Sequence, residues 1–148
     1  HTDMSDVVMN FNHNNDFVLA GTRNGSLELS VRDNGVYVPR GEVIDTSTGR
    51  DVLKLVRSGL INKMSFCFEI ADGGEFWEER NGREYRTITN IASLYDVSLV
   101  TFPAYPQTSA YIARSADDLA ELHKALMLKR KAQDERMKEL FDGKDFIK

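Results

Sequence analysis

The chain of 148 residues contains a single cysteine, Cys67, and only three prolines. One cysteine excludes an intramolecular disulfide, and the absence of paired cysteines excludes the pattern of a zinc knuckle. No apolar run approaches the ~18 residues that a membrane-spanning helix requires, and no signal-peptide-like segment lies near the N-terminus. The chain therefore has to be stabilised by a hydrophobic core, for which 148 residues are sufficient.

The chain also has no excess of basic residues. The 19 Lys and Arg residues are outnumbered by 23 Asp and Glu residues, which gives a formal net charge of -4. Surfaces that bind phosphate backbones carry an excess of basic residues, so nucleic-acid binding is disfavoured. The acids and histidines lack the spacing of metal ligands and no glycine-rich phosphate loop is present, so we expect neither a metal nor a cofactor.

Short strand-like segments fill most of the chain as far as Phe102. Residues 26–32 alternate between apolar and polar side chains, and Asn81-Gly82 separates two further segments in the strongest hairpin signal of the sequence. A helix is predicted to open at Thr48, as its N-cap, and to end near Gly59. These elements predict a mainly β (α+β) fold, an antiparallel barrel with peripheral helices, because closure removes edge strands.

The character of the chain changes at residue 115. Ser115 is a suitable helix cap, and acidic residues follow it in the first turn. An apolar stripe then continues into a charged stretch, residues 129–136, which argues against a long coiled coil. We therefore expect a core over residues 1–114 and one long C-terminal helix over residues 115–148. That helix either covers the barrel, or begins a scaffold-linked tail, or forms a dimer contact.

Three residues are candidates for a catalytic role. His13 stands in a polar turn at a strand end, Ser65 lies in a strand directly after the predicted helix, and Asp96 interrupts an apolar strand. From the residues alone each has an ordinary structural interpretation: a surface histidine, a solvent-facing serine and a solvent-facing or paired carboxylate.

The segments that contain these residues also form a recognisable set. Residues 11–14 read FNHN, residues 59–68 read GLINKMSFCF and residues 94–106 read LYDVSLVTFPAYP. They resemble, in the same order and spacing, the motifs of the prohead protease family of tailed bacteriophages, which is related in fold to herpesvirus assemblin. The sequence departs from the family pattern at Asn14, where an aspartate is usual, and at Cys67, where a glycine is usual.

The resemblance implies a serine endopeptidase that cleaves scaffold and capsid-precursor segments during procapsid maturation. It assigns Ser65 as nucleophile, His13 as general base and Asp96 as the acid that orients the histidine. The implied partners are the phage capsid precursor and the scaffold protein, with a homodimer or higher oligomer as a further expectation and with no membrane. The implied location is the host cell cytoplasm, inside the assembling procapsid. Family members carry N-terminal strands before this region, and we expect those strands to be missing here.

Two other functions are compatible with the same residues. The chain could be a catalytically inert capsid-assembly or scaffold module on the protease fold, since fold alone does not determine function. A different hydrolase, such as an esterase, would use the same three residues on another substrate.

Overall fold

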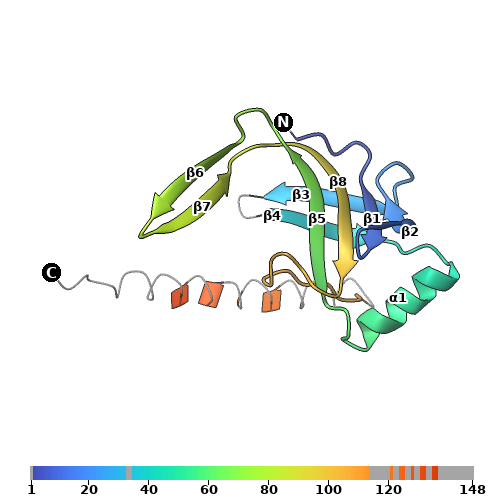
Figure 1. The fold of residues 1–148 in the computed structure, drawn as a ribbon. Helices are drawn as coiled ribbons and strands as arrows, with labels where there is room; N and C mark the ends of the chain where they lie inside the picture. The colour runs from blue at the N-terminus through green and yellow to red at the C-terminus, as the bar shows by residue number, and fades with distance from the viewer. Residues whose placement is uncertain are drawn as a thin grey trace. The chain divides into compact units, whose positions relative to one another are not determined.

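The computed structural model describes residues 2–32 and 35–113, together with positions 121, 124–125, 128, 131–132 and 135–136. The chain divides into two compact units, His1–Tyr111 and Ile112–Lys148. All strands and the helix that are defined among the described residues lie in the first unit (Figure 1).

A mixed four-stranded sheet is the centre of the first unit. It contains β1 (Val8–Phe11), β2 (Asn14–Gly21), β5 (Lys63–Ile70) and β8 (Ile91–Val100), in the order β2-β1-β8-β5. β1 pairs antiparallel with β2 and parallel with β8, while β5 pairs antiparallel with β8. β8 is thus a central strand, with the first strand of the chain, β1, on one side and β5, from the middle of the unit, on the other.

Two hairpins accompany this sheet. One joins β3 (Leu27–Arg32) to β4 (Gly35–Gly41), and the other joins β6 (Glu75–Arg80) to β7 (Arg83–Ile88). The turn between β6 and β7 is Asn81-Gly82, with positive φ angles of 54° and 72°, the backbone that a two-residue type I′ hairpin turn requires. The hairpin predicted around this pair is therefore confirmed.

The helix α1 (Ser47–Arg57) follows the β3–β4 hairpin. Its N-cap is Thr46, whose hydroxyl accepts a hydrogen bond from Gly49 N at 3.0 Å, so the expected cap at Thr48 is wrong by two residues. A Cβ atom at Gly49 would lie 2.2 Å from the backbone oxygen of Ile44, so only glycine allows the chain to turn this closely into the helix. Gly59, with a φ of 77°, follows the helix end as predicted.

One face of the four-stranded sheet packs on the hydrophobic core. Met9 and Phe66 lie beside Val97 on its two sides and share this face, which also includes Leu99. The cluster of buried hydrophobic residues consists of Val7, Met9, Leu19, Ala20, Leu27, Val52, Ile61, Leu94, Val97 and Leu99. Burial of each large aliphatic side chain contributes about 1.5–3 kcal/mol, so this cluster, rather than exposed polar contacts, holds the sheet and α1 together.

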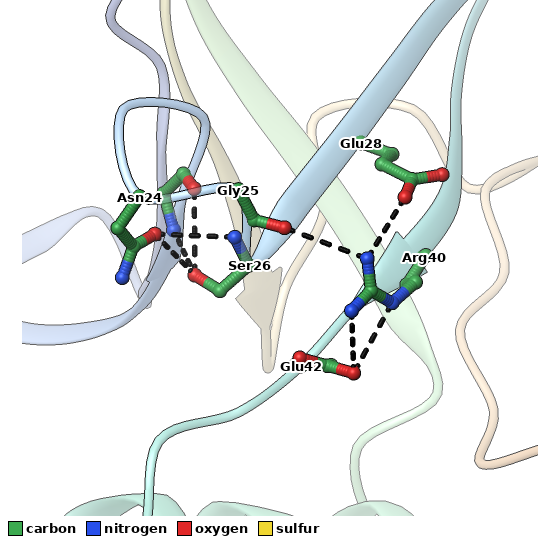
Figure 2. Close-up of polar contacts among 7 residues, drawn as sticks. Asn24, Gly25, Ser26, Glu28, Arg40 and Glu42 are labelled. Atoms are coloured by element: carbon green, nitrogen blue, oxygen red, sulfur yellow. Dashed lines mark hydrogen bonds and ion pairs between the residues drawn. The ribbon is translucent and has the colours of Figure 1, made fainter.

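Polar contacts orient the β3–β4 hairpin (Figure 2). Before β3, the Ser26 hydroxyl donates to Asn24 Oδ1 at 2.6 Å. On β4, Arg40 forms ion pairs with Glu28 at 2.9 Å and with Glu42 at 2.6 Å. These charged side chains are exposed, and an exposed ion pair contributes only about 0–1 kcal/mol to the free energy of unfolding. The ion pairs therefore affect the geometry of the hairpin more than its stability.

The expected closed antiparallel barrel is wrong. The described strands form one mixed sheet and two separate hairpins, so the four-stranded sheet keeps two edge strands, β2 and β5, within the described residues. The period of two in the sequence identifies strands but does not determine which strands pair, and the parallel contact of β1 with β8 has no local sequence signal. The fold is nevertheless mostly β.

The expected long C-terminal helix over residues 115–148 is also wrong. α1 is the one helix defined among the described residues, and between residues 121 and 136 only positions 121, 124–125, 128, 131–132 and 135–136 are described, all of them in helical conformation. The remainder of that segment lies outside the described part.

Within the described residues, no helix has both the length and the apolar character needed to cross a membrane.

Leu19 tests the role of the core. It is fully buried, whereas Leu60, just after α1, is 74% exposed. We expect Leu19→Ala to lower the free energy of unfolding by about 2–5 kcal/mol, because it removes buried methyl groups and leaves a cavity. The control Leu60→Ala should change it by less than about 0.5 kcal/mol. Urea denaturation of both variants measures the difference, and equal effects would contradict the assigned core.

Candidate active site

The face of the sheet opposite the core is polar along β5 and β8. Ser65 lies directly across from Ser98, and Cys67 lies directly across from Asp96. Residues that face each other across an antiparallel pair have side chains on the same side, and residues two apart on one strand do too. The four side chains therefore share one face, and this face is the candidate site.

His13 reaches this face from the turn between β1 and β2. The turn consists of two residues, Asn12 and His13, with positive φ angles of 55° and 56°. Such angles are unfavourable for residues other than glycine, although asparagine tolerates them best. The turn is held against the end of β8, because Asn12 N donates to Leu99 O at 2.9 Å and Asn12 Oδ1 accepts from Thr101 N at 2.9 Å. Local strain is thus offset by contacts that fix the position of His13.

His13 and Asp96 form a close pair. His13 Nδ1 lies 2.8 Å from Asp96 Oδ1, and the two side chains are 38% and 10% exposed. An ionised carboxylate can only accept hydrogen bonds, so Nδ1 donates to it, and Nε2 of the neutral ring keeps a free lone pair. A carboxylate that is this buried requires partners, and the histidine is one of them. The pair can hold a proton on Nε2 and stabilise the resulting imidazolium.

Ser98 is the second partner of the carboxylate. Its hydroxyl donates to Asp96 Oδ1 at 2.9 Å and accepts from His13 N at 3.3 Å. Ser98 is not among the site residues that the sequence predicts. The available signal was the spacing of Asp96 and Ser98, two polar residues that alternate with Val97 and Leu99 and so point to the same face of the strand.

Ser65 completes the predicted set only in part. Strand register puts it on the same face as Asp96, and it is half-buried. Among the described residues, however, its hydroxyl forms no hydrogen bond with His13 or Asp96. The structure thus brings the histidine and the acid into contact and puts the serine on the neighbouring strand.

Two hollows open on either side of His13. The larger has a volume of about 400 Å³ and is lined by Val8, His13, Asn15, Phe66, Cys67, Tyr95 and Asp96. The smaller, of about 310 Å³, is lined by Asn12, His13, Val100, Thr101 and Phe102. His13 is common to both hollows. The larger hollow lies near Asp96 on β8, and the smaller lies near Val100 at the end of the strand. Ser98 and its cross-strand neighbour Ser65 lie between these two positions along the sheet.

The larger hollow includes an exposed thiol and a phenol. Cys67 is exposed, and Tyr95 donates its hydroxyl proton to Glu69 Oε2. This hydrogen bond raises the pKa of Tyr95 above its ordinary value, because it stabilises the protonated phenol. Within the described part of the chain, no cluster of three or more histidine, cysteine or acidic side chains could hold a metal ion.

Comparisons with known proteins identify the family. The family model described as caudovirus prohead serine protease matches residues 1–123. The chain therefore belongs to the caudovirus prohead serine proteases, as the sequence motifs predicted. No curated protein and no solved structure matches the chain.

The Asn12 side chain offers a test of how His13 is held. We expect Asn12→Gly to lower the free energy of unfolding by about 1 kcal/mol, because glycine accepts the positive φ but cannot bind Thr101 N. The matched control is Asn81→Gly in the β6–β7 turn, where the side chain has no hydrogen bond among the described residues; it should change stability by a few tenths of a kcal/mol, as is usual for surface sites. Thermal unfolding compares the two, and equal losses would show that the Thr101 contact is unimportant.

Proposed function

We propose that this chain is a serine endopeptidase that cleaves scaffold and capsid-precursor segments inside the assembling phage procapsid. The observation that carries the proposal is the partly buried contact between His13 Nδ1 and Asp96 Oδ1, on a face shared with Ser65. Membership of the prohead serine proteases agrees with this chemistry. The catalytic roles of the three residues, the substrates and the partners are part of the proposal.

In the proposed reaction Ser65 Oγ attacks the carbonyl carbon of the scissile peptide bond. His13 Nε2 takes the serine proton and then passes it to the leaving amine, while Asp96 stabilises the imidazolium through Nδ1. Water then attacks the acyl ester on Ser65, with His13 again as base, and releases the second product. The free enzyme need not contain a tight serine–histidine hydrogen bond, because such contacts often shorten only when substrate binds.

Two features support Ser65 over its neighbours as the nucleophile. The Ser98 hydroxyl is fully buried and its proton is committed to Asp96, so it is unavailable for attack on a substrate. Ser65 is half-buried and its hydroxyl is uncommitted among the described contacts. The hollows on either side of His13 suit an extended polypeptide, whose side chains would enter them on both sides of the cleaved bond.

One observation favours a second candidate function. The Ser65 hydroxyl has no hydrogen bond with His13 within the described residues, which is also what an inert capsid-assembly or scaffold module would show. The two functions differ in whether Ser65 reacts.

Ser65→Ala separates these functions. We expect this variant to lose cleavage of capsid precursor and scaffold, because alanine has no nucleophilic oxygen, and to unfold at the same temperature as the unsubstituted chain. A fluorophosphonate probe followed by peptide mass spectrometry should label the unsubstituted protein at position 65 and leave Ser65→Ala unlabelled. Ser109→Ala is the control, since Ser109 is an exposed serine after β8, and it should be cleavage-competent and labelled.

Other outcomes would contradict the proposal. A wild-type rate of cleavage by Ser65→Ala would exclude Ser65 as nucleophile. Absence of both cleavage and labelling in the unsubstituted protein would favour the inert module. Modification of Cys67, the exposed thiol in the larger hollow, with no adduct on Ser65 would assign the nucleophile to a different side chain.

A further inference from the structure

Ser98 occupies the most enclosed position of the candidate site. It lies in β8 between two paired strands, opposite Asn10 on β1 and opposite Ser65 on β5. Its exposed fraction is 0%. A hydroxyl that is removed from water in this way has to find partners inside the protein, or it destabilises the fold.

Both hydrogen-bonding capacities of this hydroxyl are used within the candidate site. The proton goes to Asp96 Oδ1 at 2.9 Å, and a lone pair accepts from the backbone N–H of His13 at 3.3 Å. The same carboxylate oxygen accepts from His13 Nδ1 at 2.8 Å. The three residues therefore form a closed ring of hydrogen bonds, in which Ser98 touches the main chain of the histidine and the side chain of the acid.

We propose that Ser98 is a positioning residue that sets the orientation of Asp96 and His13 for catalysis. This inference rests on the proposed function, because it assigns a role in the same reaction. The side chain of Asp96 can rotate about two bonds, and one hydrogen bond from a histidine on a turn does not restrict both. A second donor, fixed to the central strand, selects the rotamer in which Oδ1 faces Nδ1. The bond from His13 N adds a restraint on the turn that carries the imidazole.

The size of the effect follows from the kind of bond that is lost. Ser98→Ala removes one donor to a charged acceptor and leaves His13 N without its acceptor. Loss of a hydrogen bond to a charged group corresponds to about a 10- to 100-fold change in an equilibrium or rate constant. We therefore expect kcat to fall by about 10- to 100-fold, with KM changed by less than about threefold, because Ser98 is buried and does not touch substrate.

The experiment compares three variants of the full chain. Ser98→Ala removes the hydroxyl, Ser98→Thr retains it, and Ser30→Ala removes a different buried serine hydroxyl, on β3, which has no hydrogen-bond partner among the described residues. We expect a low kcat for Ser98→Ala, at least partial recovery for Ser98→Thr, and an unchanged kcat for Ser30→Ala. Should Ser98→Ala fail to fold, Ser98→Val takes its place, since valine has nearly the shape of threonine without the hydroxyl.

A proton NMR measurement gives a readout that does not depend on activity. A histidine N–H that donates to a carboxylate exchanges slowly enough to give a separate low-field resonance. We expect this resonance from His13 in the unsubstituted chain, in Ser98→Thr and in Ser30→Ala, and its loss or broadening in Ser98→Ala. A purely structural contribution of Ser98 to the sheet would lower the unfolding temperature without moving the resonance.

Failure of this inference can be distinguished from failure of the proposed function. If Ser65→Ala is inactive while Ser98→Ala, or Ser98→Val in its place, keeps both the wild-type kcat and the His13 resonance, Ser98 has no positioning role. Equal kcat values for the threonine and valine variants would also overturn the inference. If Ser65→Ala remains active, the proposed function is wrong, and the resonance alone then decides whether Ser98 orients the His13–Asp96 pair.

Discussion

The site depends on one hydrogen bond, between His13 Nδ1 and Asp96 Oδ1, which joins residues 83 positions apart in the chain. The carboxylate is largely removed from water, so it needs this contact and the one from Ser98 to be stable in its charged form. Formation of the bond requires β8 to lie beside β1 and the Asn12-His13 turn to stay against the end of β8. The strand order of the sheet therefore has a direct consequence for chemistry.

The two faces of the mixed sheet differ: one packs on the hydrophobic core, and the other carries the candidate site. On one face, Val97 and Leu99 pack into the hydrophobic cluster that α1 also joins. On the other face, the alternate positions of the same strand carry Asp96 and Ser98. Since the side chains of a strand alternate, the rigidity that the core gives to β8 is transmitted to the polar residues between the core residues. This arrangement explains how a carboxylate can be held firmly in a strand whose other face packs into the apolar core.

The sequence predicts the structure where the signal is local, and it does not predict which distant strands pair. Asn81-Gly82 predicted its hairpin because the turn needs positive φ at both residues. The barrel was wrong because alternation does not reveal which strands pair, and nothing near Val8 indicates a parallel partner at Asp96. His13 and Asp96 become candidates through the family-like motifs; the local pattern alone allows a surface histidine and a solvent-facing or paired carboxylate. The sequence does not predict Ser98 as a site residue, because its hydrogen bond from His13 joins it to a turn that is distant in the chain, which a single sequence does not show.

The most direct test of the account is the kcat of Asp96→Asn for cleavage of the capsid precursor, measured on protein whose fold is verified by circular dichroism. Asparagine nearly preserves the shape of the side chain, but it cannot stabilise the charged imidazolium or select the tautomer with Nδ1–H. The account predicts that kcat falls by about 10³- to 10⁴-fold, the scale of this substitution in other serine protease triads. A kcat within about threefold of the unsubstituted enzyme, a change of less than about 1 kcal/mol in the activation barrier, would contradict it.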